Sequence, residues 1–389
     1  MKVLHVMNGA SGGAALSTLA LMQALRPHGI SSAVVCHDSG SPDERAHLRD
    51  VTDGAALFLP LYLWNRKLRA ATWKRPLLEV RQLLRTGAIV GSAMRVAAFA
   101  RQTRSTLVHT NTLTTPEGGL AARALGLPHV WHVRELVGPG HPFRLPVEGR
   151  TLGRLLALIA TRLIANSNAS ADALRPWLVS PERLDVVPNG IDLNSFSATL
   201  AQPAGPLRIG MVGNLSSRTK KHGLLLEAIA ALPRTLPPFT VSIYGHDVPG
   251  DTYVADLRTR IVELGIADVL RLPGFDARPA HIMAELDILV HPADNESFGR
   301  VVIEAMAASL PVVGVRGGGV GEIVVDGETG LLAPPDDPRA LASCIERLAR
   351  DPDLRRRLGA AGRRRAESLY SLDACVRGVL RSYRKASAA

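Results

Sequence analysis

Two glutamates eight residues apart, Glu296 and Glu304, have the type and spacing in this chain that best suit ligand chemistry. The apolar segment 287–291 predicts a buried strand, and the residues from Gly299 onward predict a helix. In such a unit Glu296 lies in the loop at the carboxyl end of the strand, where parallel sheets bind ligands, and Glu304 lies about one turn inside the helix. The two carboxylates can therefore face one crevice.

The residues between the two glutamates suggest what such a crevice would bind. The backbone amides of Phe298, Gly299 and Arg300 would point at a phosphate, because the start of a helix favours an anion. Glu304, tilted toward the helix start, could accept hydrogen bonds from a neighbouring pair of hydroxyl groups. A carboxylate beside an anion site suggests a sugar. The alternative is that Glu304 forms an ion pair on a solvated helix and that Glu296 is a loop charge.

A glycine loop follows the first predicted strand, at residues 8–14, and opens a predicted helix. A dinucleotide site would have G-x-G-x-x-G here, whereas Gly9, Gly12 and Gly13 give G-x-x-G-G. This spacing favours a loop for a different phosphate ligand over an NAD site or a purely structural turn. Residues 316–322 repeat the glycine loop after a later strand.

The length of 389 residues allows two domains. Short apolar strands alternate with helical patterns along most of the chain, which predicts parallel α/β sheets. The expected strands are 3–7, 33–36, 107–109, 130–133, 163–165, 185–187, 207–212, 241–244, 270–272, 288–290 and 312–315. The segment 194–206 loses hydrophobic periodicity and predicts a linker. We therefore expect domains at 1–193 and 207–370, with a final helix at 371–389 packing back onto the first domain.

The chain is basic, with 46 Lys and Arg against 35 Asp and Glu and a net charge of +11. Between Gly54 and Pro116 the only acid is Glu79, and basic residues in the stretch 66–104 alternate with Trp and Leu. This pattern favours an anionic membrane surface or a lipid-linked acceptor as partner, although a solvated helical face would explain it equally. Nucleic acid is disfavoured, because no known binding motif accompanies the charge.

The remaining composition predicts neither a metal site nor a cofactor. The three cysteines lack C-x-x-C spacing and the histidines lack paired ligand spacing. No apolar run approaches the roughly 20 residues that a membrane helix needs. We expect a cytoplasmic protein, with the inner face of the membrane as a candidate peripheral contact.

In their order along the chain, these motifs resemble the retaining glycosyltransferases of the GT-B fold, specifically family 4 (glycosyltransferase group 1). Glu296 and Glu304 match the family's E-x7-E element, and the segments 164–167 and 187–192 match the end of its first domain. The resemblance spans nearly the whole chain and implies two Rossmann-like α/β/α domains with parallel sheets facing across an interdomain cleft. Later positions carry the match further: Pro311, Gly318, Gly319, Glu322, Asp326, Gly327 and Gly330.

The resemblance also implies roles for the residues of the second domain. Glu304 would bind the ribose hydroxyls of a nucleotide-sugar donor, and Glu296, with the amides near Phe298 and Gly299, would hold the transferred sugar. Lys220 falls where the family has its phosphate-binding lysine. Residue Arg300, at the start of the same helix, belongs to this donor group.

In the first domain, the resemblance implies that His132 faces the donor sugar and its phosphate. Gly12 and Gly13 would belong to the donor site as well. Arg134 and Glu135, which follow His132, would either contact the acceptor or pair with each other.

One position departs from the family pattern. The family commonly has arginine directly after the glycine of its diphosphate loop, where this chain has Asn214. Arg218, four residues later, is the candidate to supply the missing charge, because a guanidinium can grip phosphate oxygens with two hydrogen bonds.

The implied activity is transfer of a hexosyl group, with retention, from a UDP- or GDP-sugar to a hydroxyl of a glycan or lipid-linked acceptor. Such a reaction would serve polysaccharide or lipid-linked oligosaccharide assembly. Lys220, Arg218 and the helix amides would stabilise the leaving diphosphate. The alternatives are a nucleotide-sugar binding subunit without catalysis, or a GT-B epimerase or phosphorylase.

Overall fold

The computed structural model describes residues 1–62, 75–138, 141, 145–197, 205–247 and 250–389. Within them, the chain divides into two compact units. Unit 1 contains Met1–Gly190 and Leu372–Ala389, and unit 2 contains Ile191–Ser371. The contact boundary thus falls three residues before the predicted linker at 194–206, of which 198–204 lie outside the described residues.

Unit 1 is built on a seven-stranded sheet in the order β3-β2-β1-β4-β5-β6-β7. All of its neighbouring strands run parallel. Its strands are β1 (Lys2–Met7), β2 (Ser31–His37), β3 (Ala56–Leu59), β4 (Leu107–Asn111), β5 (His129–Val133), β6 (Arg162–Ala165) and β7 (Leu184–Val186).

Unit 2 has a six-stranded parallel sheet in the order β10-β9-β8-β11-β12-β13. Its strands are β8 (Leu207–Val212), β9 (Phe239–Tyr244), β10 (Leu270–Gly274), β11 (Ile288–His291), β12 (Val312–Val315) and β13 (Gly330–Ala333). The two parallel sheets confirm the predicted α/β fold class.

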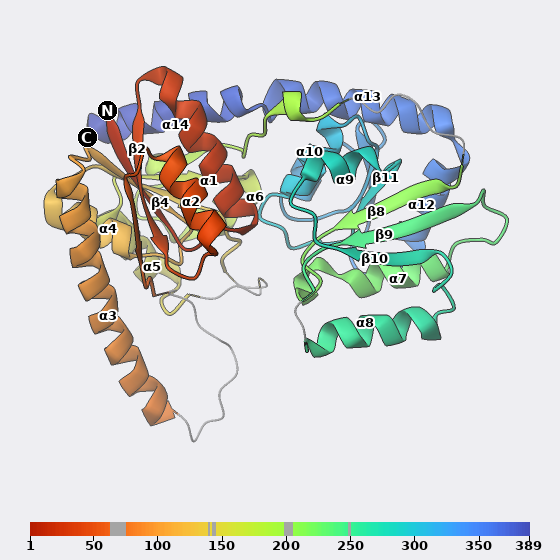
Figure 1. The fold of residues 1–389 in the computed structure, drawn as a ribbon, viewed down its shortest axis with the longest axis horizontal. Coiled ribbons are helices and arrows are strands. Elements are labelled where there is room, and N and C mark those ends of the chain that lie inside the picture. The colour runs from red at the N-terminus through yellow and green to blue at the C-terminus, as the bar shows by residue number, and fades with distance from the viewer. Residues whose placement is uncertain (63–74, 139–140, 142–144, 198–204, 248–249) are drawn as a thin grey trace. The chain divides into compact units, whose positions relative to one another are not determined.

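Helices connect the strands in both units (Figure 1). In unit 1 they are α1 (Gly12–Leu25), α2 (Pro42–Val51), α3 (Arg75–Gln102), α4 (Glu117–Leu125), α5 (Gly149–Ile159), α6 (Asn168–Leu174) and α14 (Leu372–Ser387). In unit 2 they are α7 (His222–Ala230), α8 (Thr252–Glu263), α9 (Pro279–Ala284), α10 (Arg300–Ala307), α11 (Val320–Ile323), α12 (Pro338–Arg350) and α13 (Pro352–Leu369).

The sheet of unit 1 is covered on both faces, which explains why its strands are nearly continuous apolar runs. On one face Val3, Leu107 and Val130 pack against α1 and α14. On the other face Leu4 and Val108 pack against α3 and α4. In Figure 1 the C-terminal helix α14 lies beside α1, so the end of the chain completes the first core.

Two edge strands, β3 and β13, were not among the strands that we predicted from periodicity. Each has four residues and pairs on one side only. The basic stretch 66–104 falls partly outside the described residues, and in its remainder Arg95, Arg101 and Arg104 are exposed on or just after α3. Among the described residues, no helix is long and apolar enough to cross a membrane.

Candidate functional site

The predicted site residues lie at the carboxyl edges of the two sheets. In each sheet the strand order reverses beside the first strand of that sheet, between β1 and β4 in unit 1 and between β8 and β11 in unit 2. Open α/β sheets bind ligands at such a switch point. In unit 2 the loop after β8 carries Lys220, and the loop after β11 carries Glu296.

The loop between β11 and α10 is shaped by glycines from two segments. Gly299 precedes α10 with a φ of 99°, a conformation that a β-carbon disfavours. Gly319, in the second glycine loop, donates its backbone N–H to the carbonyl of Glu296 at 2.8 Å. A β-carbon on Gly319 would lie 2.5 Å from the Cα of Phe298. In unit 2 the second glycine loop therefore serves close packing against the Glu296 loop.

Glu296 is bonded to Lys220 through its carboxylate. The Nε2 atom of His291, at the end of β11, lies 3.8 Å from the same carboxylate oxygen. Burial raises the pKa of Glu296, but Lys220 and His291 outweigh this effect, and the pKa lies below its ordinary value. Burial lowers the pKa of His291 to about 4. Glu296 is thus an anion held beside one cation and one neutral imidazole.

Glu304 lies one turn inside α10 and is only 4% exposed. Its carboxylate accepts a hydrogen bond from Nε of Arg300 at 2.7 Å. Burial raises the pKa of Glu304 above its ordinary value, and Arg300 offsets this effect only in part. Arg300, which the sequence analysis places in the donor group, therefore acts in this structure as the hydrogen-bonded partner that opposes the effect of burial on Glu304.

A second lysine, Lys221, holds the same loop and was not among the predicted site residues. Its ammonium group bonds to Asp294 and to Asp336, both at 2.7 Å. Burial lowers the pKa of Lys221, but the two carboxylates raise it above its ordinary value. The only sequence signal for this role is the pair of adjacent lysines, because the partners are 73 and 115 residues away.

The position that departs from the family pattern is occupied by a local turn. Asn214 accepts a hydrogen bond from the backbone N–H of Ser216 at 3.0 Å through its side-chain oxygen. Arg218 lies with its guanidinium 4.4 Å from the ring centroid of Tyr253 and 3.6 Å from Asp256. In this structure Arg218 is engaged on α8 and is not a partner in the Lys220–Glu296 pair.

In unit 1 three strand ends lie in register at the switch point. Met7 of β1 is opposite Asn111 of β4, which in turn is opposite His132 of β5. Gly12 begins α1 with a φ of 85°, and both Gly12 and Gly13 are exposed. The amide of Asn111 donates to the carbonyl of Ala14 at 3.3 Å, which anchors the first turn of α1 to the sheet.

His132 is buried and belongs to a row of histidines on the face covered by α1 and α14. Its Nδ1 lies 3.3 Å from Nε2 of His109, and the two rings stack with centroids 5.4 Å apart. His109 is also 5.2 Å from the ring of His5. Burial, the Arg134 guanidinium and His109 together hold the pKa of His132 well below its ordinary value. The Nε2 atom of His132 has no hydrogen-bond partner among the described residues.

Arg134 and Glu135 are both engaged inside unit 1. Arg134 donates to the side-chain oxygen of Asn111 at 2.6 Å and to that of Asn189. Glu135 accepts the backbone N–H of Leu113 at 3.0 Å and that of Arg134 at 2.9 Å. These bonds give both side chains a positioning role, and contact with an acceptor stays a prediction.

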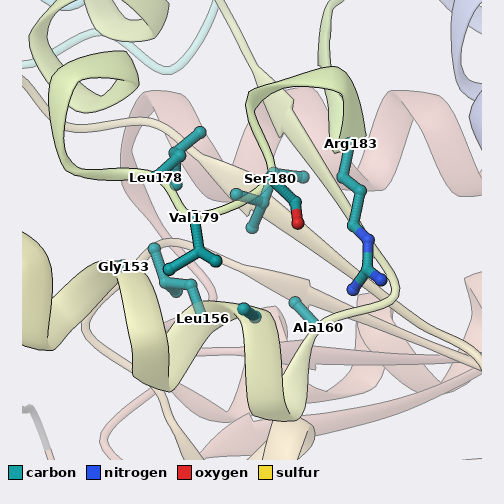
Figure 2. Close-up of a pocket in the computed structure, with 9 residues that line it drawn as sticks. Gly153, Leu156, Ala160, Leu178, Val179, Ser180 and Arg183 are labelled. Carbon is teal, nitrogen blue, oxygen red and sulfur yellow. The ribbon is translucent and has the colours of Figure 1, made fainter.

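A shallow open pocket in unit 1 lies apart from these residues. Figure 2 shows its mainly apolar lining, with Leu156 and Val179 on facing segments and Arg183 at one side. None of the predicted site residues lines it. Within the described part of the chain, no three His, Cys, Asp or Glu residues are grouped to hold a metal ion.

Two family models match the chain, one on each half. Residues 194–365 match the family described as glycosyl transferases group 1. Residues 11–195 match the family described as Glycosyltransferase Family 4.

Among curated proteins, the D-inositol 3-phosphate glycosyltransferase of Frankia alni is 35% identical over 254 residues, which cover 61% of this chain and 62% of the relative. The MMP alpha-(1->4)-mannosyltransferase of Mycolicibacterium hassiacum is 32% identical over 243 residues, which cover 60% and 56%. The chain thus spans less than two thirds of the length of these relatives.

Among solved structures, the HepE protein of Anabaena in complex with UDP-glucose has a TM-score of 0.78 and 23% identity, covering 99% of both chains. Sucrose-phosphate synthase from Thermosynechococcus elongatus has a TM-score of 0.76 and 21% identity, covering 100% of both chains. At these identities the likeness establishes the fold, which is that of GT-B proteins.

Proposed function

Because this chain belongs to the group 1, family 4 glycosyltransferases, we propose that it transfers a hexosyl group from a nucleoside diphosphate sugar to a hydroxyl acceptor. The observation that carries the proposal is the arrangement at the switch point of unit 2. There Lys220 lies on the loop that follows β8, Glu296 on the loop that follows β11, and the buried Glu304 in α10. A diphosphate needs a cation, and the hydroxyl groups of the sugar and the ribose need hydrogen-bond acceptors. The carboxyl edge of the unit 2 sheet supplies both.

In the proposed mechanism Lys220 stabilises the negative charge that develops on the leaving diphosphate. Glu296 holds the transferred sugar, and Glu304 accepts hydrogen bonds from the ribose hydroxyls. His132 is proposed to face the donor sugar and its phosphate. We propose retention at the anomeric carbon, with the leaving phosphate taking the acceptor proton on the same face.

The donor is proposed to be a UDP- or GDP-sugar. The solved HepE complexes, which contain UDP and UDP-glucose, favour UDP as the first donor to try. The acceptor is proposed to be a glycan or a lipid-linked intermediate, reached from the cytoplasmic side of a membrane. The exposed Arg95, Arg101 and Arg104 support an anionic acceptor or surface.

A donor panel tests the proposal. UDP- and GDP-sugars are incubated with the full chain, with and without lipid-linked acceptors, and nucleoside diphosphate release is followed. The expected result is release that depends on an acceptor, with the α or β configuration of the donor kept in the product. Donor binding without turnover across the panel would instead favour a binding subunit. Loss of turnover in chelator, restored by magnesium, would overturn our expectation that the reaction needs no metal.

A further inference from the structure

The buried row beneath α14 contains a chain of hydrogen-bonding groups that ends at His132. The hydroxyl of Tyr383, on α14, lies 2.6 Å from Nδ1 of His109. Nε2 of His109 lies 3.3 Å from Nδ1 of His132. All three side chains are at most 1% exposed, so water does not compete for these contacts. Each imidazole is therefore constrained by its neighbour.

The direction of the hydrogen bonds in this series, from donor to acceptor, follows from the position of Arg134. Its Nη2 atom lies 3.5 Å from Nδ1 of His132. A guanidinium only donates hydrogen bonds, so an N–H on Nδ1 of His132 would point at a positive donor. Nδ1 of His132 must therefore be the acceptor, and the single proton of the neutral ring must be on Nε2.

The donor and acceptor atoms of His109 and Tyr383 follow in the same way. Because Nδ1 of His132 accepts, Nε2 of His109 must carry the proton that it donates. Nδ1 of His109 is then an acceptor, and the Tyr383 hydroxyl is its donor. Tyr383 can fill this role because burial raises its pKa well above the ordinary value and keeps the hydroxyl protonated.

We propose that Tyr383 and His109 are positioning residues that, together with Arg134, fix His132 as the neutral tautomer with its proton on Nε2. His132 is then a hydrogen-bond donor toward its ligand, and it has no free nitrogen with which to take a proton from an acceptor hydroxyl. This inference rests on the proposed function in one respect, that the ligand of His132 is the donor sugar or its phosphate. The tautomer itself is a property of the free protein.

The geometry also gives the C-terminal helix a part in the site. Tyr383 belongs to α14, which packs on β5 and β6 and on α1. Tyr383 is the residue of this helix that contacts the histidine row through a hydrogen bond. Removing its hydroxyl leaves the apolar packing of the ring in place, so Tyr383→Phe separates the hydrogen bond from the packing.

Nitrogen-15 spectroscopy of the full chain labelled at histidine tests the tautomer. The His132 signals are identified by their loss in His132→Gln. The expected result is a protonated Nε2 and a bare Nδ1, unchanged between about pH 5.5 and 8.5. A proton on Nδ1, or a ring that titrates in this range, would overturn the proposal. Because no substrate is added, this outcome does not depend on whether the proposed transfer is found.

Two variants of His109 then test the role of the hydrogen bonds that join Tyr383, His109 and His132. In His109→Gln the amide can accept from Tyr383 and donate to His132, whereas His109→Leu has a similar size and can do neither. We expect His109→Gln to keep the His132 tautomer, and His109→Leu and Tyr383→Phe to show a mixture of tautomers. With the donor that the wild type uses, turnover should fall about tenfold in the latter two, with little change in donor KM. A pure Nε2–H tautomer and full turnover in Tyr383→Phe would contradict the role of Tyr383.

Discussion

The ammonium group of Lys220 is bonded to the carboxylate of Glu296, across 76 residues of sequence. The cation proposed for the diphosphate and the anion proposed for the sugar thus neutralise each other in this structure. A donor diphosphate has to take over hydrogen bonds of Lys220 that Glu296 holds. Glu296 and the diphosphate therefore compete for Lys220, whereas Lys220 and Glu296 cooperate in binding the whole donor.

Glu296→Gln should separate these two effects. The amide keeps the shape of the side chain but no longer holds Lys220 by charge. We expect the nucleoside diphosphate alone to bind as tightly as in the wild type or more tightly, while turnover falls about a hundredfold. Calorimetric titration with the diphosphate and steady-state kinetics with the intact donor measure the two quantities. Weaker diphosphate binding in this variant would contradict the competition.

Glu304→Gln should act mainly on donor affinity. The buried carboxylate is proposed to accept from the ribose hydroxyls, and an amide offers one acceptor fewer at that place. We expect the donor KM to rise about tenfold to a hundredfold, with a smaller change in kcat. A donor with a 2′-deoxyribose is the matched substrate. If it is affected by the variant as strongly as the ribose donor, Glu304 does not bind the ribose.

Arg300→Gln should make donor binding depend on pH. Arg300 opposes the effect of burial on Glu304, so its removal raises the Glu304 pKa further. The charged form is the one proposed to bind, so the donor KM should increase as pH falls toward that pKa. The wild type, measured over the same pH range, is the control. Parallel pH profiles for the two proteins would show that Glu304 does not bind as a carboxylate.

The adjacent lysines provide a matched pair. Lys220→Met should lower turnover about a hundredfold to a thousandfold, because a preorganised cation at the leaving group is lost. Lys221→Met should act mainly on stability, since Asp294 would lose its partner at the edge of the site. We expect a loss of about 1 to 3 kcal/mol in the free energy of unfolding. Denaturant titration and kinetics on both variants decide this, and a reversed pattern would exchange their roles.

Acid should destabilise the fold through its buried histidines. Their pKa values lie below the ordinary value, chiefly because of burial, so the unfolded chain binds more protons below about pH 6.5 and stability falls as pH drops. Each contributes a loss of about 1 kcal/mol between pH 6.5 and 5.5. The residues concerned are His5, His109, His129, His132, His222 and His291.

Urea unfolding at several pH values measures this slope. His5→Gln removes a histidine whose pKa is about 3, and it should reduce the slope over this range. The exposed His28→Gln is the control and should leave the slope as in the wild type. A stability that stays constant from neutral pH to about pH 5.5 would contradict the buried neutral state.

The sequence predicted most of what depends on periodicity and local spacing. Most strands of both sheets, the turn at Gly299 and the position of Glu304 inside a helix follow from short patterns. The edge strands β3 and β13 were not predicted, because a strand of four residues with one neighbouring strand has little periodic signal. The spacing of residues in the sequence also did not predict the role of Lys221, because its carboxylate partners come from loops far along the chain.

The surroundings of His132 show the same limit. Its strand was predicted, but its partner His109 comes from β4, 23 positions away. The partner of His109 is Tyr383 of the C-terminal helix, 274 positions from His109. A buried histidine and a buried tyrosine in apolar strands and helices look like core residues in sequence. Only the pairing of strands and the docking of α14 bring their polar atoms together.

The central claim is that the Lys220, Glu296 and Glu304 group of unit 2 drives sugar transfer from a nucleotide donor. The most direct test is nucleoside diphosphate release from the preferred donor, with acceptor, by wild type, Lys220→Met and Glu304→Gln side by side. We predict acceptor-dependent release by the wild type, a strongly lowered kcat in Lys220→Met and a raised donor KM in Glu304→Gln. Wild-type kinetics in both variants would contradict it.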